Sequence, residues 1–125
     1  RRLGVFEAFV FHGALSRRAS MELLAGARAA IIPSKLESFG LPYYEALALG
    51  VPVIAADRPF AREACGDAAL YAGADDAASF AEHVGAVLDG KCATLGRSGQ
   101  ERFRCVRQDW HQVGERYSRL AEAIC

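Results

Sequence analysis

Residues 33–52, PSKLESFGLPYYEALALGVP, constrain the fold of this chain more than any other stretch. The run before it, residues 29–32, is short, apolar and partly β-branched, which is typical of a buried strand. Pro42 suits the first turn of a helix, where its fixed φ helps and its missing N–H is not needed. Gly50 suits a left-handed helix end, and residues 51–56 are typical of a second buried strand. The stretch therefore predicts a strand, a glycine-bearing loop, a helix and another strand.

The predicted loop has the chemistry of a ligand site. It lies at the carboxyl end of a parallel strand, where the helix N-terminus points into a crevice. Unpaired N–H groups of Phe39, Gly40 and Leu41, with the helix dipole, would bind a phosphate or clustered hydroxyls. Glu37 and Glu45 add carboxylates that accept paired hydrogen bonds from sugar or ribose hydroxyls. The loop therefore predicts a nucleotide-sugar site, unless Glu37 is only solvated and Glu45 only complements the dipole.

These residues resemble the E-x7-E signature of retaining glycosyltransferases of the GT-B fold, family-4 type. The family pattern is met here by Pro33-Ser34, Glu37, Phe39-Gly40-Leu41-Pro42, Glu45-Ala46, Gly50 and Pro52-Val53. Residues 62–71, REACGDAALY, are similar to a family segment that contains Gly-Asp-Ala-Ala. The resemblance runs from Phe9 to Trp110 and thus covers nearly the whole chain.

Composition limits the classes of partner. The 125 residues suffice for one domain with a core, and 52% of them are hydrophobic. Fifteen basic and fifteen acidic residues leave no net charge, so we expect neither nucleic acid nor an anionic membrane as an electrostatic partner. No targeting peptide or membrane-spanning run is visible, and we expect a cytoplasmic setting. The four cysteines have no metal-ligand spacing, so we expect no metal and no disulfide.

Near the N-terminus, residues 8–12 predict a strand that Gly13 ends. Ser20 is a candidate cap for the helix that follows. The resemblance places the backbone around His12 and Gly13 near the nucleotide base, so both are candidate donor-binding residues. A lone histidine at a strand end is also common as a structural hydrogen-bonding group.

The second half of the chain predicts an alternation of helices and strands. We expect a helical turn at residues 62–66, a strand at 69–71, a helix capped by Asp75-Asp76, and helices at 95–106 and 109–123. Two apolar stripes at helical spacing are expected to pack in the core: Phe80, Val84, Val87 and Leu88 in one helix, and Trp110, Val113, Tyr117 and Leu120 in the last. The resemblance implies that the helix within residues 107–125 also contacts the N-terminal domain of the enzyme.

The fold class expected is α/β, a Rossmann-like parallel sheet with flanking helices. By the resemblance, residues 1–125 are part of the C-terminal, nucleotide-sugar-binding domain, and the N-terminal acceptor domain is missing. So are the strands that would lie between the strand at residues 9–11 and the strand at 31–32. Those two strands would then pair directly or leave open edges. We expect the isolated chain to be marginally stable or self-associating, and any peripheral membrane contact to come from absent segments.

The activity implied by the resemblance is transfer of a sugar from a nucleoside-diphosphate sugar to a hydroxyl, with retention of configuration. Glu37 is the candidate catalytic residue, and Ser38, Phe39, Gly40, Leu41 and Glu45 bind the donor, with Glu45 on the ribose diol. The donor is a substrate, and the family commonly needs no metal and no other cofactor. Such enzymes often build surface polysaccharides, and we expect this piece alone to be inactive.

Three other functions fit parts of the sequence. A GT-B nucleotide-sugar epimerase shares the fold, but the full Phe-Gly-Leu-Pro motif with Glu45 favours a transferase. A non-catalytic nucleotide-binding or interaction module would keep the fold without the chemistry. A flavodoxin-like receiver domain would need an early acidic cluster, which this sequence lacks.

Overall fold

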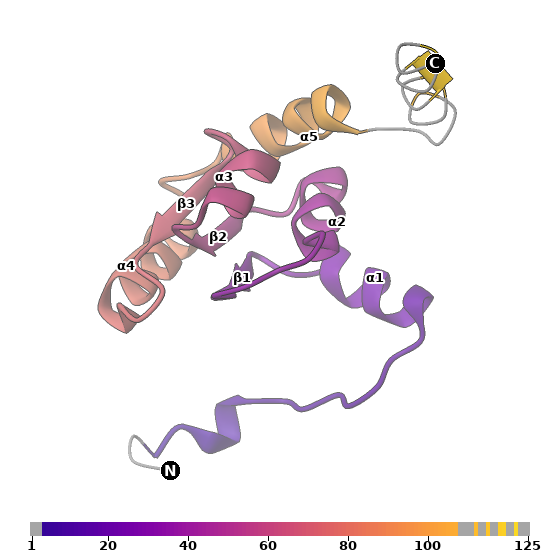
Figure 1. The fold of residues 1–125 in the computed structure, drawn as a ribbon. Helices are drawn as coiled ribbons and strands as arrows, with labels where there is room; N and C mark the ends of the chain where they lie inside the picture. The colour runs from indigo at the N-terminus through magenta and orange to yellow at the C-terminus, as the bar shows by residue number, and fades with distance from the viewer. Residues whose placement is uncertain (1–3, 108–111, 113–114, 116–117, 120–121, 123–125) are drawn as a thin grey trace.

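The computed structural model describes residues 4–107, 112, 115, 118–119 and 122. In chain order the elements are the 3-10 helix η1 (Phe6–Ala8), α1 (Arg17–Ala25), β1 (Ala30–Ile32), α2 (Leu41–Leu49), β2 (Val53–Ala56), α3 (Pro59–Cys65), β3 (Ala69–Ala72), α4 (Ala77–Leu88) and α5 (Leu95–Val106). Figure 1 shows the strands in the middle of the body, with helices around them. The helix expected at residues 109–123, with its stripe of Trp110, Val113, Tyr117 and Leu120, lies largely outside the described residues.

The three strands form one parallel sheet in the order β1-β2-β3. Ile54 of β2 lies between Ile31 of β1 and Leu70 of β3. All four residues of β2 are buried, as expected for a central strand covered on both faces. The predicted fold class, an α/β Rossmann-like parallel sheet with flanking helices, is confirmed.

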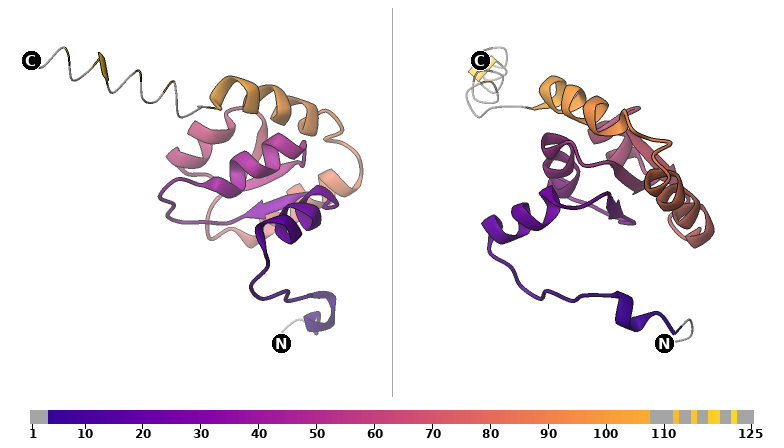
Figure 2. Two further views of the ribbon diagram at one scale, coloured as in Figure 1. Left: turned by 90° about the vertical axis from the view of Figure 1, so that its right-hand side faces the viewer. Right: turned by 180° about the vertical axis from the view of Figure 1, so that it is seen from behind.

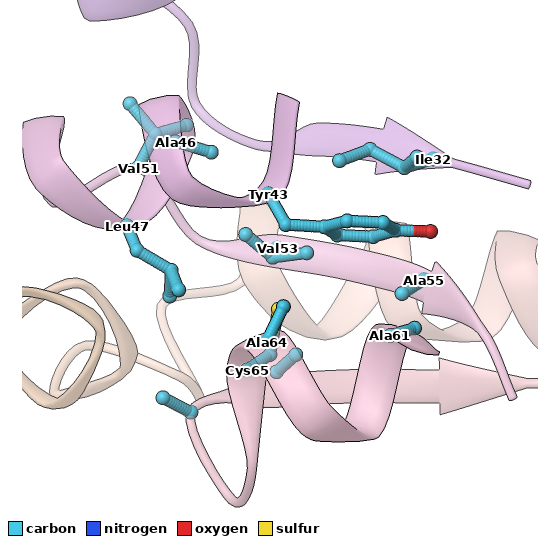
Figure 3. Close-up of a cluster of buried hydrophobic side chains, with 12 residues drawn as sticks. Ile32, Tyr43, Ala46, Leu47, Val51, Val53, Ala55, Ala61, Ala64 and Cys65 are labelled. Atoms are coloured by element: carbon cyan, nitrogen blue, oxygen red, sulfur yellow. The ribbon is translucent and has the colours of Figure 1, made fainter. Parts of the chain in front are cut away.

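Helices α2 and α3 cover one face of the sheet, and α4 packs on the other face against β2 and β3 (Figure 2). Alternate residues of β2 serve the two layers: Val53 and Ala55 face α2 and α3, whereas Ile54 and Ala56 face the other side. The core on the α2 side includes Ile32, Tyr43, Ala46, Leu47, Val51, Ala61, Ala64 and Cys65 (Figure 3). The stripe expected in α4 is partly buried, since Val87 is buried but Leu88 is exposed.

Helix α5 packs across α2 and α3 and holds the end of α3. The Arg102 guanidinium donates hydrogen bonds to the carbonyl oxygens of Glu63 and Ala64, two acceptors that α3 leaves free at its last turn. Next to them, Cys65 is fully buried, and this burial raises the pKa of its thiol to about 11. The close approach of α5 to α2 depends on Gly96, where a Cβ would overlap the carbonyl oxygen of Gly50.

Local signals set most helix ends. Gly50 ends α2 with φ 70°, and the Asp76 side chain accepts the backbone N–H of Ser79 at the start of α4, as predicted. The prediction that Ser20 caps the first helix is wrong. Ser16 is the cap, with its hydroxyl 3.2 Å from the Ala19 nitrogen, because the residues between the two serines tolerate a helix and extend it upstream.

The prediction of a strand at residues 8–12 is wrong. Ala8 ends the short helix η1, and residues 9–16 form an irregular segment that leads to α1, so that η1 lies away from the sheet (Figure 1). Phe9, Val10 and Phe11 are exposed, and Phe11 contacts the rings of Phe6 and Phe9. A strand needs a partner for its N–H and C=O groups, and within residues 4–107 this segment has none, so its β propensity has no effect.

The outer edge of β1 is therefore open within the described part of the chain. Direct pairing between the segment at residues 9–11 and β1, one of the two arrangements expected, does not occur. Among the described residues, no helix is long and apolar enough to cross a bilayer.

Candidate functional site

The candidate site is built on the loop between β1 and α2. Gly40 immediately precedes α2 with φ 71°, a left-handed conformation that allows the chain to turn sharply into the helix. Because it has no side chain, it also leaves α2 without a side-chain cap. In the part of the chain that the structure describes, the amides of Ser38, Phe39, Gly40 and Leu41 donate no hydrogen bond. The loop thus presents unpaired donors at the positive end of a helix, as predicted for an anion or hydroxyl receptor.

Glu37 lies on this loop, and a hydrogen bond from Ser34 orients its side chain. One oxygen of its carboxylate accepts the hydroxyl of Ser34 at 2.7 Å, in a partly buried position. The second carboxylate oxygen can still accept hydrogen bonds from a ligand. Ser34 and Glu37 therefore form a small pre-oriented unit at the end of β1.

A cavity of about 400 Å³ opens beside the loop. The loop contributes Glu37, Ser38 and Phe39, and the other lining residues are Tyr44, Phe60, Glu63, Phe103, Val106 and Arg107. The Phe39 and Tyr44 rings lie 5.7 Å apart between their centres. Aromatic faces with carboxylates suit a hydroxylated ring, whose C–H faces are apolar and whose rim accepts and donates hydrogen bonds.

Glu45 is not among the residues that line this cavity. It lies one turn inside α2, and its carboxylate is 3.6 Å from the guanidinium of Arg17 on α1. The Glu45 side chain is 24% exposed, so it remains reachable from solvent. The two acids of the motif thus have different neighbours, Glu37 on the side of α3 and α5 and Glu45 on the side of α1.

The other predicted site residues do not all lie at the cavity. Gly40 is buried at the end of the loop and Leu41 is exposed at the first position of α2, and neither is among the residues that line the cavity. His12 and Gly13 lie in the exposed segment before α1, and neither lines the cavity. The strand expected to end at His12 is not formed, and the donor-binding role that the resemblance implies for His12 and Gly13 stays a prediction.

Further charges lie at the carboxyl ends of the strands. Asp57, which follows β2, accepts two hydrogen bonds from Arg62 at 2.6 and 2.8 Å, and these lower the pKa of the Asp57 carboxyl. Lys35 pairs with Asp75 after β3 and lowers the pKa of that carboxyl in the same way. The buried Nε of Arg58 has no hydrogen-bond partner among the described residues.

Comparison with known proteins identifies the family. The sequence profile of "Glycosyl transferases group 1" matches residues 1–102. The chain belongs to this glycosyltransferase family. Over 116 residues it is 34% identical to the glycogen synthase of Mycobacterium tuberculosis, covering 90% of this chain and 28% of that protein. Over 62 residues it is 40% identical to the O-antigen chain mannosyltransferase B of Escherichia coli, covering 50% of this chain and 16% of that protein.

The chain therefore spans less than a third of the length of either relative. The family match ends within α5, so it includes the loop, α2, α3 and most of the cavity. The sequence did not predict the wall of this cavity that comes from Phe60, Glu63 and Phe103. No local signal marks these residues, because only the packing of α3 and α5 beside α2 brings them to the loop.

Proposed function

We propose that the protein containing this chain transfers a sugar from a nucleoside-diphosphate sugar to a hydroxyl acceptor with retention, and that this chain supplies part of the donor site. The observation that carries the proposal is the loop before α2, where the amides of four consecutive residues have no partner among the described residues and lie beside the Glu37 carboxylate. The group 1 glycosyltransferase family and its sugar-transferring relatives support the same reaction class. The acceptor would bind outside the described residues.

The chemistry requires two kinds of charge stabilisation at once. Departure of the nucleoside diphosphate leaves negative charge on phosphate oxygens, and the sugar becomes oxocarbenium-like. The amides of Ser38, Phe39 and Gly40, with the dipole of α2, would bind phosphate oxygens or sugar hydroxyls. Glu37 would hold hydroxyls of the transferred sugar and place negative charge near the developing cation.

Glu45 is proposed to bind the ribose diol, because a carboxylate accepts both vicinal hydroxyls. The pair with Arg17 is exposed on the arginine side, at 78%, so the ribose would compete with a weak surface ion pair. The ligand would approach Glu45 from the side of α1, and the sugar would extend toward Glu37.

Glu45→Ala in the full-length protein should weaken nucleotide binding about ten- to a hundred-fold, because hydrogen bonds to a charged group contribute about 1.5–3 kcal/mol. Calorimetric titration with UDP, GDP and ADP measures this. Glu22→Ala is the matched control, since Glu22 pairs with Arg18 on the exposed side of α1 and has no place in the site. Equal affinities of wild type and Glu45→Ala would contradict the ribose role, and no binding of any of the three nucleotides to wild type would contradict the proposed function.

A further inference from the structure

The side chain of Tyr43 combines complete burial with an unused polar group. Its relative exposure is 0%, and within the described residues its hydroxyl has no hydrogen-bond partner. A buried hydroxyl without a partner destabilises the folded state, and phenylalanine would fill the same space without that penalty. The hydroxyl therefore needs an explanation beyond packing.

The ring of Tyr43 lies against Gly40, in the loop between β1 and α2. A Cβ on Gly40 would come within 2.8 Å of the ring carbon Cδ2 of Tyr43, so the loop backbone rests on the ring. Figure 3 shows the ring lying lengthwise between Ile32 and Ala55, with its hydroxyl pointing to the carboxyl ends of β1 and β2. The unused hydroxyl is thus aimed at the edge of the sheet where the loop with Glu37 begins.

The electrostatics connect this hydroxyl to Glu37. Burial raises the pKa of the Tyr43 phenol to about 12, and the nearby negative charge of Glu37 contributes to this rise. The phenol therefore stays protonated at neutral pH and can donate a hydrogen bond, and it interacts electrostatically with the Glu37 carboxylate. Glu37 uses one oxygen on Ser34 and has a second oxygen without a protein donor among the described residues.

We propose that Tyr43 is a positioning residue of the donor site, whose hydroxyl donates a hydrogen bond to the Glu37 carboxylate when the donor sugar is bound. A rotation of the Glu37 side chain would give the phenol its partner, and the carboxylate would then be held by both Tyr43 and Ser34. The loop is already supported by the Tyr43 ring, so the backbone need not move. The inference rests on the proposed role of Glu37 as the group that holds the sugar.

The test compares Tyr43 with Tyr71, a partly buried tyrosine whose hydroxyl has a protein partner. Burial raises the pKa of Tyr71 to about 12 as well, but its hydroxyl donates to the Gly66 carbonyl at 2.6 Å and lies outside the cavity. In the full-length protein, Tyr43→Phe should keep or raise the urea midpoint of unfolding and lower kcat about ten- to a hundred-fold, with little change in KM. Tyr71→Phe should do the reverse, lowering the midpoint and leaving kcat unchanged.

The probes are UDP-glucose, GDP-mannose and ADP-glucose, with release of the nucleoside diphosphate as the readout. A Tyr43→Phe protein with wild-type kcat, or with a lowered unfolding midpoint, would overturn the inference while leaving the proposed function intact. A structure with bound donor in which the Tyr43 and Glu37 oxygens stay beyond about 3.5 Å would also overturn it. A wild-type protein that uses none of the three donors would refute the proposed function, and the role of Tyr43 with it.

Discussion

Replacing Gly96 with alanine should destabilise the fold by about 2 kcal/mol or more. The new methyl group would overlap the backbone carbonyl of Gly50, so α5 would have to move away from α2. A shift of α5 also disturbs Leu47, which is fully buried and packs against Gly99 of the same helix. Urea denaturation followed by circular dichroism measures the change in the free energy of unfolding.

The matched control is Gly85→Ala in the middle of α4. A Cβ there meets no atom within 4 Å, so alanine should stabilise the helix by about 0.5–1 kcal/mol. The two substitutions are chemically identical, but a backbone carbonyl faces the new methyl group at residue 96 and open space faces it at residue 85. If both variants unfolded at the wild-type midpoint, the packing of α5 against α2 would not be as the structure shows it.

Glu37→Gln in the full-length enzyme should lower kcat roughly 100-fold or more. Glutamine keeps the size of the side chain and can still accept the Ser34 hydroxyl, but it removes the negative charge placed near the oxocarbenium-like sugar. Donor binding depends mainly on the amides and on Glu45, so KM for the donor should change much less than kcat. Steady-state kinetics at varied donor concentration separates the two parameters.

Glu82→Gln serves as the control for net charge, because Glu82 is exposed on α4, across the sheet from the cavity. The kcat of the Glu82→Gln variant should equal that of wild type. A Glu37→Gln enzyme with a raised donor KM and unchanged kcat would assign Glu37 to binding and remove it from the chemistry.

The middle of the chain was predictable because its signals are local. Pro42, Gly50 and Asp76 each act through their own backbone or side chain, and each has its predicted role. The unpaired amides of the loop follow from the same local geometry, since Gly40 lacks a side chain that could cap α2. The core of the candidate site could therefore be predicted without knowledge of the rest of the fold.

Features that depend on distant residues could not be predicted. The segment at residues 8–12 has strong β propensity, but a strand exists only where another strand pairs with it. The cavity wall formed by Phe60 and Phe103 requires α5 to cross α2, which depends on the small size of Gly96. Tyr43 was predicted only as part of a helix, since nothing in the sequence indicates that its hydroxyl is buried with no partner in the part of the chain that the structure describes.

The rate at which the buried thiol of Cys65 is alkylated can measure local opening of this domain. Thiolates react with alkylating reagents, and a buried thiol with a pKa of about 11 is both inaccessible and protonated at neutral pH. Cys105, on the exposed side of α5, should be alkylated at once in the native state. The slow labelling of Cys65 then measures how often α3 and α5 separate, and a bound nucleotide that couples to this region would slow it further.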